Sequence, residues 1–269
     1  TPTLAIVVER EEKILQFVPR DYWEVRATFG CKAGEYDGRW FDPDFRRPED
    51  DEHARAERLW DQARAESIVA ACSGKPGTVS EEAKPSTQAP PLLFDLTSLQ
   101  REGNGRFGFS AKTTLSIAQA LYEKHKVLTY PRTDSRALPE DYVGVAKKTV
   151  EALTGQKAYA PFARQVAKGG WIKPNKRIFD NAKVSDHFAI IPTLEAPRSL
   201  TEAEQKIYDL VVKRFLAIFF PSAEYLVTTR ITTVEGHQFR TEGKVLVEPG
   251  WLAVYGKEAM QEQGALAKV

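Results

Sequence analysis

Thr201–Pro221 (TEAEQKIYDLVVKRFLAIFFP) is the stretch from which the fold class can be read. Thr201 and Glu204 have the spacing of a capping box, in which each side chain binds the backbone amide of the other at the start of a helix. The apolar residues that follow recur every three or four positions, as they do on the buried face of a helix; they are Ile207, Leu210, Val211, Phe215 and Ile218. Pro221 cannot continue a helix, so we predict one helix that ends before it.

The hydrophobic period changes from 3.6 to 2 after Pro221. Residues 225–232 alternate between two faces, a turn follows at residues 235–237, and residues 239–247 return. This pattern is typical of an antiparallel hairpin. Trp251–Tyr255 is predicted to add another strand.

Similar patterns occur in the N-terminal part of the chain. Residues 1–17 show helical spacing, and residues 22–29 alternate as a half-buried strand. Residues 30–50 are predicted to form turns with one short strand, and Asp50 is expected to cap a helix that runs to about Ala71. A short strand is predicted over residues 78–83 before a Pro-rich boundary near residue 91.

The region between Pro91 and Pro221 is mostly helical in pattern. A short helix is expected to begin at Asp95 or Thr97 and to end at Gln100, and Ser110 is a plausible N-cap for a helix running to His125. Pro139 is well placed as the first residue of another helix. Residues 168–198 are predicted to be irregular. We therefore predict an α+β protein in which a mostly helical domain, residues 92–221, is inserted into a β-rich domain made of residues 18–91 and 222–269.

Composition limits the possible function classes. The chain has 269 residues, with 28% charged and 42% hydrophobic side chains and a net charge of +1, which is ordinary for a globular protein. Cys31 and Cys72 form no CxxC pair and four histidines are scattered, so no zinc site or disulfide framework is predicted. Asp42 and Asp44 form a D-x-D pair, but Arg46 stands where an acidic metal triad would need a third carboxylate. We interpret the pair as a turn. No segment is apolar enough over a sufficient length to cross a membrane.

Tyr130–Ser135 (YPRTDS) is the segment with the most distinctive chemistry. Pro131 restricts Tyr130 to an extended backbone. On an extended backbone, residues i and i+2 point to the same face, so the Arg132 guanidinium is predicted to lie beside the Tyr130 phenol. A tyrosine hydroxyl can act as a covalent nucleophile, and a guanidinium can hold a phosphate through two parallel hydrogen bonds. The alternative interpretation of such a segment is a buried tyrosine beside a surface arginine, which is the commoner case.

Five blocks of sequence carry a resemblance that favours the first interpretation. Tyr130–Ser135 resembles the active-site tyrosine motif of type IA DNA topoisomerases, in the form typical of topoisomerase III. Four further blocks, in the same order as in that family, cover most of the chain: TPTLAIVVERE with YWEV (1–11 and 22–25), PLLFDLTSLQ (91–100), RFGFSAKTTL (106–115) and SDHFAIIPT (185–193).

The resemblance implies a mechanism. Tyr130 would attack a phosphodiester of single-stranded DNA, form a 5′-phosphotyrosyl link and release a 3′-hydroxyl, without ATP. Arg132 would stabilise charge on the phosphoryl oxygens, and His187 would bind a nearby phosphate or order the site. The family often has a second histidine where this chain has Phe188.

Three further residues are candidates for DNA binding. Asp134 and Ser135 are expected to orient the loop or the tyrosine and to lie at the DNA. Lys112, at the start of a predicted helix, can meet a phosphate, although a solvated surface lysine is the commoner case.

The resemblance also implies a domain plan and a cofactor. Residues 1–17 would be a helix from the gate-supporting domain, and the β-rich domain would be a barrel-like hinge. Mg²⁺ would be bound by an acidic cluster in a domain that precedes this sequence, so no metal is expected here and the fragment is expected to be inactive by itself. Its partners would be single-stranded DNA and the remaining domains of its full-length chain. Its place would be the cytoplasm of a bacterium, in association with DNA, with no membrane contact.

Other hypotheses stay open at this point. One is a module that grips single-stranded DNA without chemistry; another is a structural fragment that binds nothing alone. A tyrosine recombinase is disfavoured, because it would need several dispersed Arg and His residues around the tyrosine.

Overall fold

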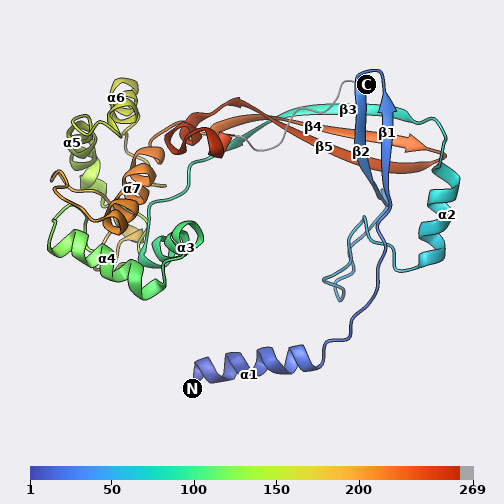
Figure 1. Ribbon diagram of the computed structural model, residues 1–269, viewed down its shortest axis with the longest axis horizontal. Coiled ribbons are helices and arrows are strands. Elements are labelled where there is room, and N and C mark those ends of the chain that lie inside the picture. The colour runs from blue at the N-terminus through green and yellow to red at the C-terminus, as the bar shows by residue number, and fades with distance from the viewer. Residues whose placement is uncertain (261–269) are drawn as a thin grey trace. The chain divides into compact units, whose positions relative to one another are not determined.

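An open five-stranded sheet with the strand order β1-β2-β5-β4-β3 runs through the computed structural model, which describes residues 1–260 (Figure 1). Strands β1 and β2, and strands β2 and β5, pair antiparallel. The expected barrel-like closure is not confirmed, since β1 and β3 lie at the two edges of the sheet among the residues described. The chain is thus a mixed α and β protein with an open sheet.

The chain divides into two units, each described here by itself. Unit 1 comprises Thr1–Lys84 and Val227–Lys244, and unit 2 comprises Pro85–Leu226 and, within the described residues, 245–260. The division falls within β3, β4 and β5. The helices and strands, in chain order, are α1 (Pro2–Leu15), β1 (Arg26–Cys31), β2 (Gly34–Phe41), α2 (Gln62–Cys72), β3 (Thr78–Gln88), α3 (Leu96–Phe107), α4 (Ala111–Glu123), η1 (Glu140–Tyr142), α5 (Val143–Leu153), α6 (Ala160–Gly169), η2 (Asn181–Lys183), α7 (Glu202–Ala217), β4 (Ala223–Val234), β5 (His237–Glu248), η3 (Gly250–Tyr255) and η4 (Lys257–Met260).

Unit 1 has a small core of its own beneath the strands. Trp40 and Phe239 are buried together with Ile68 from α2. The hairpin of β4 and β5 turns through Glu235 and Gly236, whose φ angles of 47° and 80° are those of the turn that best matches the twist of paired strands. The predicted hairpin is therefore confirmed.

The predicted start of the helix in unit 1 was wrong. Helix α2 begins after Asp61 and not at Asp50, because the Asp61 side chain accepts from the Ala63 amide and caps the helix there. Asp51 holds the preceding segment in a turn by accepting from the amide of His53. The Asp42 pair does form a turn, in which Asp42 accepts from the amide of Asp44.

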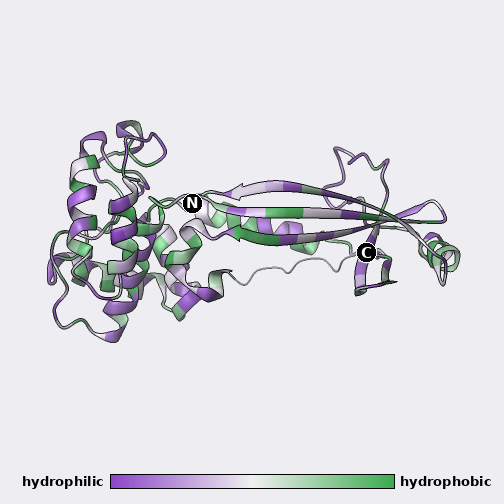
Figure 2. Cartoon of the chain, turned by 90° about the horizontal axis from the view of Figure 1, so that it is seen from above, coloured by the Kyte–Doolittle hydropathy of each residue, from purple (hydrophilic) through white to green (hydrophobic). Residues whose placement is uncertain are grey.

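Unit 2 is organised around α7, which is buried along most of its length. The predicted capping box is present: the Glu204 amide donates to the Thr201 hydroxyl at 3.3 Å, and the Thr201 amide donates to the Glu204 carboxylate at 2.8 Å. Accepting from that amide holds the pKa of Glu204 below its usual range. Figure 2 shows hydrophobic and hydrophilic residues mixed on each helix, as expected of helices with one buried face.

Helix α3 is longer than predicted and passes close to α4. It ends at Phe107 and not at Gln100, although Gly103 and Gly105 lie inside it. A Cβ at Gly103 would lie 3.0 Å from the Thr114 hydroxyl, so the glycine permits the close approach of the two helices. Tertiary packing therefore outweighs the low helix propensity of glycine here.

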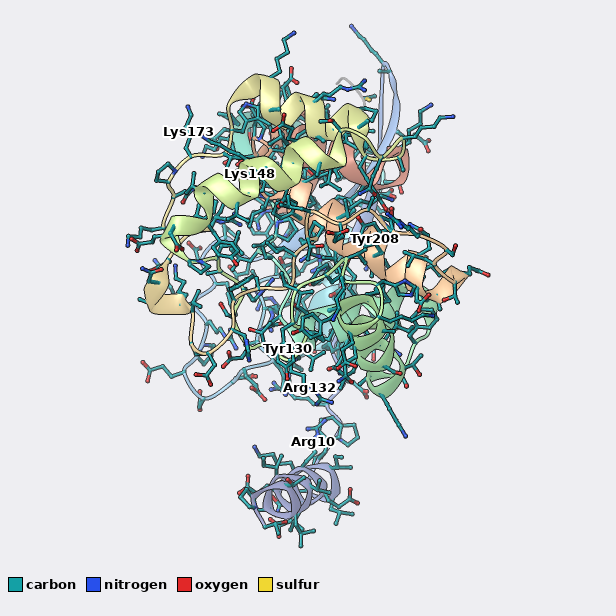
Figure 3. The ribbon with its side chains drawn as sticks, turned by 90° about the vertical axis from the view of Figure 1, so that its left-hand side faces the viewer. Arg10, Tyr130, Arg132, Lys148, Lys173 and Tyr208 are labelled. Atoms are coloured by element: carbon teal, nitrogen blue, oxygen red, sulfur yellow. The ribbon has the colours of Figure 1, made fainter. Side chains whose placement is uncertain are left out.

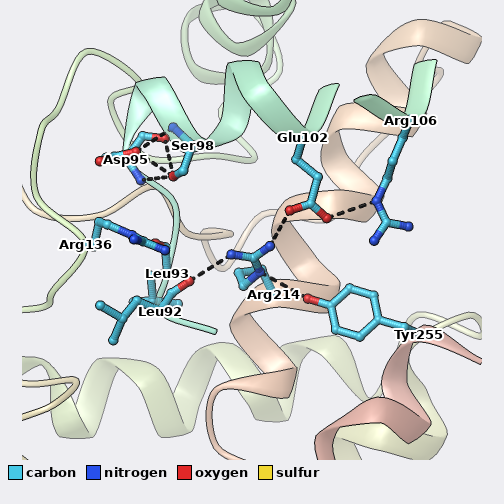
Figure 4. Close-up of polar contacts among 9 residues, drawn as sticks. All are labelled: Leu92, Leu93, Asp95, Ser98, Glu102, Arg106, Arg136, Arg214 and Tyr255. Atoms are coloured by element: carbon cyan, nitrogen blue, oxygen red, sulfur yellow. Dashed lines mark hydrogen bonds and ion pairs between the residues drawn. The ribbon is translucent and has the colours of Figure 1, made fainter. Parts of the chain in front are cut away.

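A buried arginine joins four parts of unit 2 (Figure 4). From α7, Arg214 donates to the Leu92 carbonyl at 3.0 Å and to the Tyr255 hydroxyl at 3.1 Å, and it pairs with Glu102 of α3. Burial raises the pKa of Tyr255. A buried guanidinium needs this full set of acceptors, because an unpaired buried charge is costly.

The predicted strand at Trp251–Tyr255 was wrong, because η3 occupies these residues. Gly250 turns the chain with a φ of 48°, and the Trp251 amide donates to the Pro221 carbonyl at 3.0 Å. These contacts fold the segment back against the end of α7, where Tyr255 reaches Arg214.

The cap of α7 supplies a test of how unit 2 is stabilised. Replacing Thr201 by Ala removes the acceptor of the Glu204 amide, so Thr201→Ala should lower the free energy of unfolding by about 1 kcal/mol. Thr201→Ser keeps the hydroxyl and should unfold at nearly the native urea concentration. Equal urea midpoints for the Ala and Ser variants would show that the cap contributes nothing.

Candidate functional site

Burial alternates along the tyrosine segment, as expected of side chains on two faces. Pro131, Thr133 and Ser135 are buried, whereas Arg132 and Asp134 are exposed. The side chain of Tyr130 is partly exposed. Tyr130, Arg132 and Asp134 therefore share one face of the segment, and Figure 3 shows Tyr130 and Arg132 at the same end of unit 2.

Backbone pairing fixes the position of this segment next to the histidine motif. The Thr129 amide donates to the Ile191 carbonyl at 3.0 Å, and the Thr193 amide donates to the Val127 carbonyl at 3.0 Å. The Thr129 hydroxyl accepts from the Ile191 amide at 2.9 Å and donates to the Ala189 carbonyl at 3.1 Å. The two motifs are thus joined along their backbones just before Tyr130.

A second set of hydrogen bonds joins the motifs just after Tyr130. The buried Thr133 hydroxyl donates to the His187 carbonyl at 3.0 Å and accepts from the Ser135 amide at 3.1 Å. The Ser135 hydroxyl donates to the Lys183 carbonyl at 2.7 Å. Because Ser135 is only 4% exposed, these contacts favour its role in orienting the loop over contact with DNA.

Two rings lie against Tyr130. The His187 ring centroid is 4.3 Å from that of Tyr130, with 44° between the planes. Tyr122 of α4 meets Tyr130 edge to face at 5.4 Å. His187 is exposed, so the histidine covers one side of the phenol while facing solvent. No sequence pattern pointed to the contact with Tyr122.

An open pocket of about 360 Å³ adjoins the tyrosine. Tyr122, Tyr130 and Phe188 supply aromatic surface to it, and Lys126 supplies a positive charge. The Lys126 ammonium lies 5.8 Å from the centre of the Tyr122 ring. The Phe188 ring also contacts the Tyr142 ring, with 4.6 Å between the centroids and 53° between the planes. Aromatic faces beside a cation are the elements that single-stranded nucleic acid binds.

The charged residues of the site differ in how they are engaged. Arg132 is exposed and makes one long hydrogen bond, 3.4 Å to the Gln119 side chain, with no ion pair to any described residue. Its remaining N–H donors face solvent. Asp134 accepts from the Ser185 hydroxyl at 3.2 Å, so it links the two motifs a third time.

Lys112 lies apart from this cluster. It is exposed in the first turn of α4, seven residues before Gln119, which places it about 10 Å along the helix axis from that residue. No group of three or more His, Cys, Asp or Glu that could hold a metal ion lies together in residues 1–260. None of the helices described there is long and apolar enough to span a membrane.

Comparisons with known proteins identify the family of this chain. The family model described as DNA topoisomerase matches residues 1–269. The chain is 41% identical over 258 residues to DNA topoisomerase 3 of Bacillus subtilis, covering 95% of this chain and 33% of that protein. It is 41% identical to DNA topoisomerase 3 of Shouchella clausii, covering 100% of this chain and 35% of the relative. The chain thus spans about a third of the length of these relatives.

A solved structure shares the fold. Full-length topoisomerase I from Thermotoga maritima superposes with a TM-score of 0.65 at 22% identity, covering 99% of this chain and 41% of that one. Together with the match over the whole chain, this confirms the resemblance inferred from the five blocks: the chain belongs to the DNA topoisomerase family.

Proposed function

We propose that this chain carries the nucleophile of a type IA, topoisomerase III-like enzyme that cleaves and rejoins single-stranded DNA. The supporting observation is the packing of His187 against Tyr130, with the unpaired guanidinium of Arg132 on the same face. Two motifs 57 residues apart are held together by hydrogen bonds on both sides of the tyrosine.

The proposed step is an exchange of one phosphodiester bond for another. The Tyr130 oxygen attacks the phosphorus and loses its proton, while the bond from phosphorus to the 3′-oxygen breaks and that oxygen gains a proton. Arg132 would donate to the phosphoryl oxygens as their charge grows. His187 would bind an adjacent phosphate or hold the phenol in place. Because the phosphotyrosyl link conserves the energy of the broken phosphodiester bond, the reverse reaction would reseal the strand without ATP.

We propose that Mg²⁺ and the acidic groups around it come from another part of the full-length protein. The described residues do not fit a metal site, because no group of three or more His, Cys, Asp or Glu lies together among them. The fragment alone is then expected to be inactive in relaxation and decatenation. The site of action would be DNA in a bacterial cytoplasm.

We also propose a moving role for the sheet. The chain passes from β3 into the helical part of unit 2 and leaves it through β4, so the helical part is carried on strands at both ends. Such a connection suits a hinge that swings the tyrosine-bound DNA end away for strand passage.

A binding module without chemistry remains the second candidate. The aromatic pocket beside Lys126 favours it, because base stacking on exposed rings requires no nucleophile. Salt-dependent binding of a single-stranded oligonucleotide that survives in Tyr130→Phe, with no adduct under any condition, would favour this candidate.

The covalent step can be tested with a labelled single-stranded oligonucleotide, Mg²⁺ and an SDS quench. The chain should form an adduct when the preceding portion of a topoisomerase 3 relative is added in trans, and Tyr130→Phe should abolish it. An adduct from the chain alone would contradict the proposal that the metal-binding groups lie elsewhere.

Arg132→Ala should slow adduct formation by about 10²–10³-fold, the effect of losing one donor to a developing oxyanion. Arg198→Ala makes the same charge change at another exposed position and should leave the rate unchanged.

The role of Thr133 as a positioning residue gives a second test. Thr133→Val keeps the shape but removes the donor to the His187 carbonyl, leaving buried polar groups unpaired, so the free energy of unfolding should fall by about 1–3 kcal/mol. The rate of adduct formation should fall as well, because His187 is no longer held against Tyr130. Thr133→Ser retains the hydroxyl and should restore both quantities. A Val variant with the native rate would show that this contact does not position the site.

A further inference from the structure

The surface formed by α5, α6 and the loop that follows them is strongly basic. Residues 143–173 carry six basic side chains and one acidic one, Glu151, a net charge of +5 over 31 residues. The whole chain carries +1, so the remaining residues together carry −4. The basic residues are Lys147, Lys148, Lys157, Arg164, Lys168 and Lys173, and all six are exposed.

These charges are not neutralised by neighbouring acids. None of the six makes an ion pair with a described residue, and Glu151, one helical turn after Lys147, makes none either. Elsewhere in unit 2 lysines are commonly paired: Lys183 lies 3.0 Å from Asp180, Lys206 2.6 Å from Glu202 and Lys213 2.8 Å from Asp209. Six unpaired cations within 31 residues therefore concentrate positive charge on this surface.

Two of the six basic residues line an open groove of about 500 Å³: Lys147 of α5 and Lys173 after α6. The acidic Glu151 lines it too, together with apolar side chains that include Val150, Val166 and Ile172. Figure 3 shows Lys148 and Lys173 near each other, well separated from Tyr130 and Arg132. A polyanion bound here would thus occupy a different place from a strand bound at the tyrosine.

No aromatic side chain lines this groove. Tyr159 is buried, and the rings of Phe162 and Trp171 both contact Phe220, at 6.5 and 4.9 Å. Proteins that bind single strands combine basic grooves with exposed aromatic rings, whereas duplex backbones are bound through phosphates by Lys and Arg. The pocket beside Tyr130, by contrast, is lined by the rings of Tyr122, Tyr130 and Phe188.

We propose that the α5–α6 surface binds the phosphate backbone of a DNA duplex, independently of sequence and separately from the single strand at Tyr130. The inference rests on the proposed DNA partner but not on the role of Tyr130 as nucleophile. Binding of this kind releases counterions, so log K falls linearly with log[salt] with a slope of about −0.9 for each phosphate contacted.

The test measures binding of the chain to a short labelled duplex by fluorescence anisotropy over a series of salt concentrations. The variant Lys147→Gln, Lys148→Gln, Lys173→Gln should bind more weakly at every salt concentration, and its slope should be smaller by about three, one for each lost contact. The control variant Lys183→Gln, Lys206→Gln, Lys213→Gln makes the same change in net charge at paired positions and should retain the native slope.

Each remaining outcome decides the proposal. Equal slopes for the two triple variants would overturn it, because the effect would then follow net charge alone. An equal loss of affinity for a single-stranded oligonucleotide would also overturn it. The proposal would also be overturned if the chain bound anionic phospholipid vesicles more strongly than duplex DNA and the Lys147, Lys148, Lys173 triple variant lost that binding. Tyr130→Phe should leave the duplex slope unchanged. If no adduct forms in the covalent assay but the Lys147, Lys148, Lys173 triple variant still has a smaller slope, the nucleophile is rejected and the duplex-binding surface is kept.

Discussion

The hydroxyl groups of Thr129 and Thr133 are the constraint on which the site depends. Each both donates and accepts a hydrogen bond, and each donates to a carbonyl of the histidine motif. They flank Tyr130 at odd-numbered positions, which face inward, so the even-numbered positions are left for the phenol and the guanidinium. The local alternation of an extended chain thus separates the residues that hold the loop from those that face a substrate. A preorganised catalytic site requires supporting hydrogen bonds of this kind, because they hold the residues that face a substrate in one geometry.

Unit 2 presents two kinds of surface that differ in physical character. Around Tyr130, rings dominate and the nearby charges are few, which suits unpaired bases. On α5 and α6, charge dominates, the groove lining contains no aromatic side chain, and the partly exposed rings of Phe162 and Trp171 contact Phe220. The lysines of α5 and α6 lie on solvent-exposed helix faces, where a charge needs no protein partner. The buried Arg214, by contrast, makes all of its hydrogen bonds within unit 2. In unit 2 the buried guanidinium is therefore fully paired, whereas the lysines of α5 and α6 are exposed and make no ion pair with a described residue.

Local patterns predicted much of this molecule, and the failures have identifiable causes. The capping box at Thr201 and the turn at Gly236 depend on near neighbours, so their sequence signals are sufficient. The shared face of Tyr130 and Arg132 follows from backbone geometry. By contrast, η3 mimics a strand in its apolar content, and contacts with Pro221, 30 residues earlier, decide its shape. The same holds for the ring contacts of Tyr130 with His187 and Tyr122, because distances between residues far apart in sequence are set by tertiary packing.

Helix α1 has a thermodynamic consequence of its own. Its 14 residues include no buried side chain among those described, although Leu4, Ile6 and Leu15 are large and apolar. A helix of this length is marginal in water, because the nucleation cost is barely recovered without packing. Its cap at Thr1 and Pro at the first position favour initiation but supply little energy. The helix content of this segment therefore depends on whether its apolar side chains are packed against another surface. Such packing would raise the helix content, and circular dichroism would detect it as a coil-to-helix transition.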